Sequence, residues 1–459
     1  MRFAPTAALL LGCASGGTEP ARDRDATNDA VADVTDAFAE AAVDAPPDLS
    51  DAAPKLPARV FLEPIAESPA PTKTPPTWNA HLSKLVGDAS FLYAVHTSFT
   101  EEVATRYAAI MRRARSGGPW TEVARVSYPH QPPGVVMDPS GTLHMVFDCL
   151  RPSTADVTCF AGGAGTSGVN SRFYHLAFGA RDGASALRFD TYANWNEWTA
   201  LSNGYHGIGL LADGTVVWAL ADAAWGRVVQ YRTPSGATGT AATLTRPSTY
   251  LLYPILFGNE ATKLGLFAGE FDPAGGTNAG YPAAALFTGS TTGLTERLRI
   301  TPPTKVDPGA VGAYPSDIER ADDGTVYALV YKKDADRCTE LLRFDGGLAA
   351  TPKPFSLGCL ETYAKLQLSR SGLLYVLGSG DATGMRLGVS GDRGATWTFG
   401  ALAFDTPLGA GDVRIVGATL IKTYTSPKLH DPDVMTFFAA GLDAAGTSKR
   451  SYFGRVELR

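Results

Sequence analysis

The sequence predicts a single all-β propeller preceded by a disordered tether, and three observations support this prediction. The 459-residue chain contains 49 glycines and 31 prolines, which is typical of turn-rich β structure. A hairpin pattern recurs along the chain, each copy centred on a glycine. Amphipathic helical stretches, which a parallel α/β fold requires, are nearly absent. We therefore assign residues 58–459 to one β domain.

The repeated unit is a strand, a tight turn and a second strand. Each turn holds a glycine, which tolerates the positive φ that such hairpins need. An apolar residue stands six positions before each glycine and another stands two positions after it. The four copies are VVMDPSGTLHMVF at Gly141, IGLLADGTVVWAL at Gly214, IERADDGTVYALV at Gly324 and LQLSRSGLLYVLG at Gly372.

The spacing of these glycines predicts a propeller. Gly324 and Gly372 set a period of about 50 residues, which is typical of a four-stranded blade. The longer interval before Gly324 leaves room for an unmarked copy around YPILFGNEATKLGLFAG, and DASFLYAVHTS and DVRIVGATLIKTY are two weaker candidates. We therefore expect seven four-stranded blades, with six or eight as the alternatives.

The N-terminus has the features of a targeting segment. Arg2 is followed by an apolar run that is too short to span a bilayer and suits a signal peptide. The residues LLGC, ending at Cys13, resemble the bacterial lipobox. This resemblance implies that residues 1–12 are a signal peptide and that Cys13 is lipidated. Because Ala14 rather than aspartate follows the cysteine, resemblance to enteric lipoproteins implies the outer membrane of a bacterial cell envelope. An ordinary secretion signal is the alternative.

Residues 13–57 form the predicted tether. They are rich in alanine, aspartate and proline and poor in aromatic residues, so they cannot bury enough apolar surface to fold. Their like charges repel one another and extend the chain. Ten acidic and three basic residues give this segment a net charge of −7, against −6 for the whole chain, which leaves the body near neutral. A neutral body offers no broad basic face for phosphates, so nucleic acid is excluded as a partner.

The cysteines are consistent with export. Four remain besides Cys13, and an even number outside the cytosol favours disulfides. Sequence alone permits three pairings, and proximity favours the pairing of neighbours. Metal binding is the rival interpretation, but no C-x-x-C spacing supports it. The favoured pairs are Cys149 with Cys159 and Cys338 with Cys359.

The stretch SGDRGATW carries a resemblance to a known superfamily. It matches the aspartate box S-x-D-x-G-x-T-W, and RSGGPWTEV at residues 115–123 is a degenerate relative. The chain thus resembles the aspartate-box (BNR-repeat) propellers, which include sialidases, polysaccharide lyases and hydrolases. The resemblance implies a structural turn joining the outer two strands of a blade, away from any active site. Its residues here are Ser390, Asp392, Gly394, Thr396 and Trp397.

Sialidase activity is not expected. The F/Y-R-I-P motif of sialidases is absent, and the nearest string, LRITPP from Leu298, lacks the proline after isoleucine and lies in the middle of the chain. The box therefore indicates a fold and not a reaction.

Aromatic and imidazole side chains recur just before the aligned strands. In a propeller the innermost strands begin at one mouth of the central channel, where such rings would stack on sugars. The predicted ligand funnel comprises His130, Tyr205, His206, Tyr253, Tyr314, Tyr363 and Arg172. The plainer interpretation is that these rings only pack neighbouring blades.

We expect the first of three functions, and the other two are its alternatives. The first is non-catalytic recognition of a glycan or of an envelope protein. The second is a carbohydrate-active enzyme, a polysaccharide lyase more readily than a glycosidase, in which a His or Tyr pair moves the proton and Arg172 or Arg320 neutralises a uronate. The third is an envelope component without a ligand. No cofactor is predicted; KLHDPD, with His430, Asp431 and Asp433, is either a cation site or a solvated turn.

Overall fold

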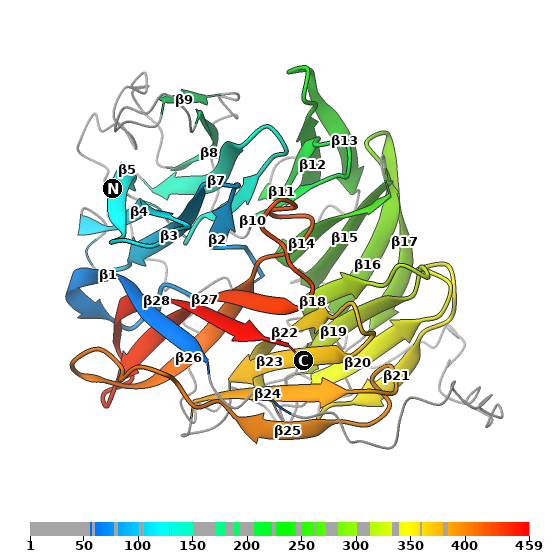
Figure 1. The fold of residues 1–459 in the computed structure, drawn as a ribbon. Helices are drawn as coiled ribbons and strands as arrows, with labels where there is room; N and C mark the ends of the chain where they lie inside the picture. Colours follow the sequence, from blue (N-terminus) through cyan, green and yellow to red (C-terminus); the bar gives the residue numbers. More distant parts are fainter. Residues whose placement is uncertain are drawn as a thin grey trace, which may run out of the picture.

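The fold of the chain is known from a computed structural model. It describes residues 56, 60–77, 81–100, 102, 105–127, 129, 131–150, 171–179, 188–191, 206–222, 226–244, 250–260, 263–271, 283–300, 313–332, 339–358, 360–379 and 384–458. These residues are all β, without an α-helix. The all-β propeller predicted from the repeats is therefore confirmed (Figure 1).

The strands of the described residues form seven four-stranded antiparallel sheets. Six of these sheets are built from strands that follow one another in the chain. The first three comprise β2 (Leu85–Gly87), β3 (Phe91–Ser98), β4 (Tyr107–Ala114) and β5 (Thr121–Ser127); β6 (Gly134–Met137), β7 (Thr142–Leu150), β8 (Ser171–Gly179) and β9 (Arg188–Thr191); and β10 (His206–Leu210), β11 (Val216–Asp222), β12 (Gly226–Arg232) and β13 (Thr238–Leu244). The next three comprise β14 (Tyr250–Glu260), β15 (Lys263–Phe271), β16 (Ala283–Ser290) and β17 (Gly293–Ile300); β18 (Ala313–Arg320), β19 (Val326–Lys332), β20 (Thr339–Phe344) and β21 (Lys353–Ser356); and β22 (Glu361–Leu368), β23 (Leu374–Ser379), β24 (Met385–Ser390) and β25 (Thr398–Ala401).

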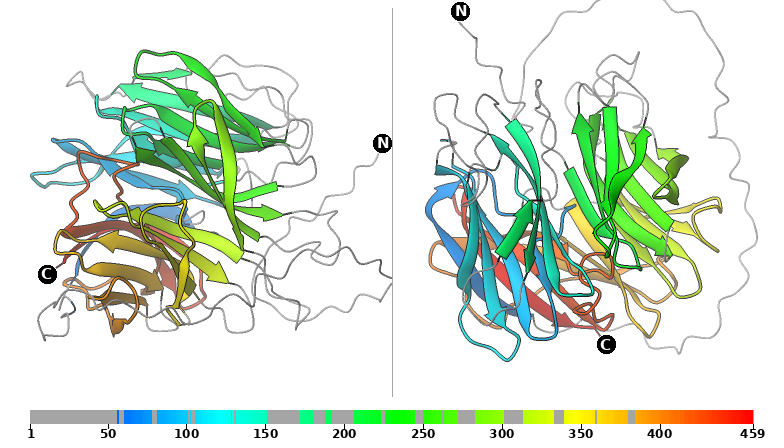
Figure 2. Two further views of the ribbon diagram at one scale, coloured as in Figure 1. Left: turned by 90° about the vertical axis from the view of Figure 1, so that its right-hand side faces the viewer. Right: turned by 90° about the horizontal axis from the view of Figure 1, so that it is seen from above.

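The last sheet joins the two ends of the described chain. It contains β26 (Asp412–Leu420), β27 (Val434–Asp443) and β28 (Ser448–Glu457), and β1 (Phe61–Thr72) forms its outer edge. β1 pairs antiparallel with β28, so the blue and red ends of the chain lie side by side (Figure 2). Backbone hydrogen bonds between the first and last strands thus close the ring and protect the edge that either strand would otherwise expose.

The four predicted turn glycines each join the first two strands of a sheet. Gly141, Gly214, Gly324 and Gly372 have φ of 87°, 85°, 87° and 81°, which an L side chain rarely adopts. Each donates its N–H to the carbonyl three residues earlier, as Gly141 does to Asp138 O at 2.9 Å. The three weaker copies lie on the turn before β3 and β3 itself, on β14–β15, and on β26 with the residues after it. The repeat therefore located the innermost hairpins correctly.

The hydrophobic core lies between neighbouring sheets. Val86 and Tyr93 of one sheet pack with Val135 and Met145 of the next. At another junction a glycine pair replaces side chains: Gly207 and Gly209 alternate along β10 and approach the backbone of β14. This close approach needs residues without a Cβ.

The SGDRGATW stretch forms the turn between β24 and β25, the outer two strands of their sheet. Asp392 accepts hydrogen bonds from the backbone N–H and the hydroxyl of Thr396 (2.8 and 2.6 Å) and from the Ser390 hydroxyl (2.7 Å). Gly394 has φ of 91°, and Trp397 Nε1 donates to its carbonyl at 2.9 Å. The turn is thus held by its own side chains and backbone.

Several sequence predictions lie outside the described residues. The signal peptide, Cys13 and the tether up to residue 55 are among them, as are Cys159, Cys338 and Cys359. Cys149 is described only as part of β7. Within the described part of the chain no helix is long and apolar enough to span a membrane.

Candidate functional site

The innermost strands of the sheets define two faces of the ring. We call the face where β2, β6, β10, β14, β18, β22 and β26 begin the start face, and the face where they end the end face. The predicted ligand funnel belongs to the start face, because its residues other than Arg172, which lies near the beginning of β8, lie near or before the beginnings of these strands.

Three predicted funnel residues are described with their side chains. His206 is the first residue of β10, and Tyr253 and Tyr314 lie on β14 and β18; all three are buried. Tyr253 and Tyr314 meet edge to face with ring centroids 5.8 Å apart, and Tyr331 of β19 completes the cluster. The structure therefore brings part of the funnel together, in a packed arrangement.

The remaining funnel residues cannot be placed in the same way. His130 and Tyr205 lie outside the described residues. Tyr363 and Arg172 belong to β22 and β8, but their side chains are outside the described set.

His81 is a start-face residue that the sequence interpretation missed. Its Nε2–H donates to the carbonyl of His206 at 2.8 Å, and its ring meets Tyr253 edge to face at 5.3 Å. Burial lowers the pKa of His81 well below its ordinary value, so the ring is neutral. With the proton on Nε2, the other nitrogen is a hydrogen-bond acceptor. Among the described residues this buried Nδ1 has no donor.

The backbone at Tyr253 is strained. Its φ is +51°, an unusual value for a bulky residue, and it falls within an irregularity in the pairing of β14 with β15 between Leu252 and Ile255. Such strain persists only where surrounding structure enforces it, and it concentrates at functional sites.

Two buried lysines lie beneath the start-face rings. Lys84 Nζ donates to the carbonyls of Pro132 (3.1 Å) and Pro133 (2.5 Å), and Lys365 Nζ donates to Ser316 O at 2.5 Å. Burial lowers the pKa of Lys84 well below its ordinary value. It lowers the pKa of Lys365 to about 8, although the carboxylate of Asp317 opposes this shift. Both lysine amines are therefore buried, with backbone carbonyls in place of water as hydrogen-bond partners.

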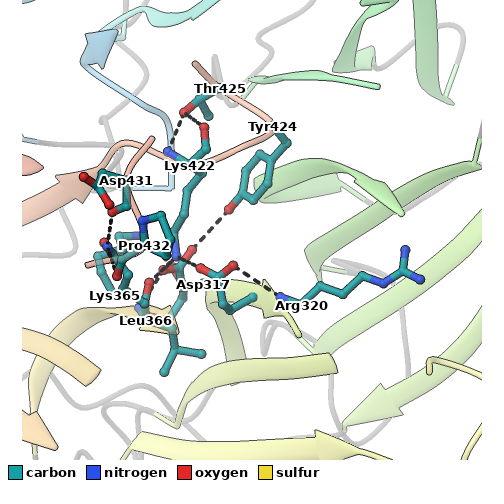
Figure 3. A network of polar contacts seen from close by, with 12 residues as sticks. Asp317, Arg320, Lys365, Leu366, Lys422, Tyr424, Thr425, Asp431 and Pro432 are labelled. Carbon is teal, nitrogen blue, oxygen red and sulfur yellow. Dashed lines mark hydrogen bonds and ion pairs between the residues drawn. The ribbon is translucent and has the colours of Figure 1, made fainter. Parts of the chain in front are cut away.

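A third lysine joins several elements at the centre of the ring (Figure 3). Lys422 forms ion pairs with Asp317 (3.0 Å) and Glu319 (2.7 Å) and donates to the carbonyl of Leu366. The side chains of Lys422 and Asp317 are each 4% exposed. Burial alone would lower the pKa of Lys422, but the two carboxylates raise it above its ordinary value. Lys422 is therefore a buried cation held by two strands of other sheets.

Lys422 belongs to residues 421–433, which we call the β26–β27 loop. This loop runs across the end face (orange in Figure 1). Leu210 N donates to Tyr424 O and Met137 N to Thr425 O, both at 2.8 Å, and the Ser426 hydroxyl donates to Gly87 O at 2.8 Å. The loop thus binds the ends of β10, β6 and β2 as well as β18 and β22, and it covers the channel on this side.

The KLHDPD stretch is part of the same loop. Asp431 and Asp433 pair with Arg370 at 3.4 and 3.3 Å. Nowhere in the described part of the chain do three or more His, Cys, Asp or Glu residues form a metal-binding group. Both aspartates therefore contact the same arginine, and the cation site and the solvated turn both stay predictions.

Comparison with known proteins relates this architecture to other propellers. No family model and no curated protein matches the chain. Among solved structures, the polysaccharide lyase Uly1 superposes with a TM-score of 0.51 at 10% identity, covering 83% of this chain and 90% of that one. An ulvan lyase gives a TM-score of 0.55 at 10% identity over 84% and 94%, and the BP39L lectin from Burkholderia pseudomallei gives 0.50 at 10% over 81% and 96%. At this identity the likeness shows the fold alone.

Proposed function

We propose that the chain is a seven-bladed propeller of the aspartate-box type, in which each sheet is one blade. We propose further that it binds a glycan at its start face and does not catalyse a reaction. The observation that carries the proposal is the buried Nδ1 acceptor of His81, which lacks a donor among the described residues. Buried polar atoms are nearly always paired, so an acceptor without a donor is suited to a ligand donor. A sugar hydroxyl is such a donor.

Two features of the same place support this proposal. Tyr253 and Tyr314 pack edge to face beside His81, and aromatic side chains of this kind are common in sugar-binding sites, where their rings stack on apolar sugar faces. Tyr253 is also held in a strained backbone conformation, which is typical of sites where geometry serves binding. Both a lectin and polysaccharide lyases share the fold, so the architecture is compatible with glycans.

The test of this proposal is a glycan array followed by titration of the full-length chain. His81→Phe keeps the edge contact with Tyr253 but removes both ring nitrogens. We expect it to weaken the affinity for the bound glycan about 10-fold, the usual effect of losing one or two hydrogen bonds. His206→Ala is a second variant at the same mouth.

The outcomes separate the remaining functions. Binding that His81→Phe and His206→Ala leave unchanged would place the ligand elsewhere, and no signal on any sugar would favour an envelope protein as the partner. Release of unsaturated product from a uronate polymer can be followed by ultraviolet absorbance. Such release would show that the protein is a lyase and not a non-catalytic binding protein.

We further propose that the propeller is held at the bacterial outer membrane by a lipid on Cys13, with residues 13–57 as the tether. The sequence LLGC after an apolar run supports this. Cys13→Ser should move the protein from the membrane fraction to the soluble fraction of the envelope and abolish incorporation of labelled fatty acid. Labelling that survives the substitution would exclude Cys13 as the attachment site.

A further inference from the structure

A cavity of about 680 Å³ lies at the end face, opposite the predicted funnel. Its walls come from the turn after β18, the turn after β22 and the β26–β27 loop. We call it the end cavity. Its volume is within the range of about 300–1,000 Å³ that small-molecule sites occupy. Nothing in the start-face proposal uses it.

The inner wall of the end cavity is aromatic and aliphatic. Phe257 and Tyr424 meet edge to face with ring centroids 6.4 Å apart, and Ile318 and Val326 line the space beside them. Tyr424 is held in place because its hydroxyl donates to Asp317 Oδ1 at 3.3 Å and its carbonyl accepts from Leu210. A fixed ring beside aliphatic side chains is a surface on which a sugar ring can stack.

Much of the charge at the rim of the end cavity is held in ion pairs. Arg393 of the SGDRGATW turn pairs with Asp323 at 3.1 Å. Arg370 is shared between Asp431 and Asp433, and Glu319 pairs with Lys422 at 2.7 Å. An ionic ligand would have to displace one of these ion pairs, and it would gain little net electrostatic attraction from the rim. The paired groups still present spare N–H donors and carboxylate acceptors, which suits hydroxyl groups because each can donate and accept.

A histidine also lines the wall of the end cavity. His430 lines the end cavity, and its buried Nε2 has no hydrogen-bond partner among the described residues. Burial lowers the pKa of His430, so the imidazole is neutral at neutral pH. A neutral imidazole nitrogen offers one directional hydrogen bond without a charge.

We infer that the end cavity is a second binding site, for a neutral oligosaccharide of a few sugar units. The aromatic wall would stack on one sugar ring, and His430 and the paired rim groups would bond its hydroxyls. This inference is independent of the start-face proposal, because the two sites share no residue and lie on opposite faces of the ring.

The test fills the cavity and leaves the rest of the protein unchanged. Thr423 is exposed and lines the cavity, so Thr423→Trp should occlude it. Thr292 is an exposed threonine in the β16–β17 turn, away from the cavity, and Thr292→Trp is the matched control. Neutral gluco-, manno- and galacto-oligosaccharides are screened against the full-length chain by saturation-transfer NMR, and bound sugars are titrated calorimetrically.

We expect at least one neutral oligosaccharide to bind in the micromolar to millimolar range. Thr423→Trp should weaken it more than 10-fold, and Thr292→Trp should change it less than 2-fold. His430→Phe keeps a ring but removes both nitrogens, and it should weaken the affinity for this sugar about 5- to 10-fold. If Thr423→Trp does not fold, the result for His430→Phe decides whether the end cavity binds the sugar.

Three results would overturn the inference: no neutral oligosaccharide bound at millimolar concentration, binding only of charged glycans, or binding unchanged by both cavity variants. If every sugar that binds responds to His81→Phe and none responds to Thr423→Trp or His430→Phe, the start-face proposal is supported and the end cavity is refuted. If every sugar that binds responds to the cavity variants and none to His81→Phe, the end cavity is supported and the start-face proposal is refuted.

Discussion

Lys422→Met is expected to lower the free energy of unfolding by about 3–5 kcal/mol, the usual cost of removing one partner from a buried ion pair. Methionine has a similar length but no charge, so it would leave Asp317 and Glu319 without their shared cation. The lost ammonium also holds the carbonyl of Leu366, so the β26–β27 loop would lose one of its attachments to β18 and β22.

Urea unfolding, followed by far-ultraviolet circular dichroism, measures this effect. Lys428→Met is the matched control, because Lys428 is an exposed lysine on the same loop, and it should change stability by no more than about 0.5 kcal/mol. The double variant Lys422→Met with Asp317→Asn should recover part of the loss, since it removes an unpaired buried charge. A loss below about 1 kcal/mol for Lys422→Met would show that the centre of the ring does not depend on this ion pair.

The same pair predicts how stability responds to alkali. The pKa of Lys422 is raised in the folded protein, so folding favours its protonated form. Its contribution is therefore complete below the ordinary lysine pKa and is lost as pH rises through the raised folded value. The difference in stability between the wild type and Lys422→Met should be constant around neutral pH and shrink only under strongly alkaline conditions.

Gly209→Ala should destabilise the protein by about 3 kcal/mol, at the upper end of the usual cost of overpacking. A Cβ at this position would overlap the backbone carbonyl of Leu256 on β14. Backbone cannot rotate away as a side chain can, so the two innermost strands would have to separate. Their neighbours in the ring would resist that movement.

The control for this substitution is Gly293→Ala. Gly293 has no heavy atom near the position of an added Cβ and no positive φ, so alanine there should be nearly neutral, within about 0.5 kcal/mol. Urea midpoints with unchanged m-values would compare the two variants. Equal stability of Gly209→Ala and Gly293→Ala would mean that β10 and β14 can separate at little cost.

The G-x-G spacing on β10 shows a limit of sequence reasoning. Gly207 and Gly209 stand two residues apart, which puts them on one face of a strand, and that spacing could have indicated a close strand contact. The turn glycines were easier to interpret because a local hairpin needs only its own residues. His81 could have been found in a similar way, since it precedes β2 as His206 begins β10.

The sequence by itself determined the all-β class, the repeated hairpins and the position of the SGDRGATW turn, because these depend on backbone preferences within a few residues. Only the tertiary structure decided which face of the ring is covered and which polar groups meet. Lys422 reaches Asp317 and Glu319, and His81 reaches His206 and Tyr253, across sheets far apart in the chain. Such contacts form only when the ring closes, because closure sets the distances between sheets. A local pattern of side chains in the sequence carries no information about those distances.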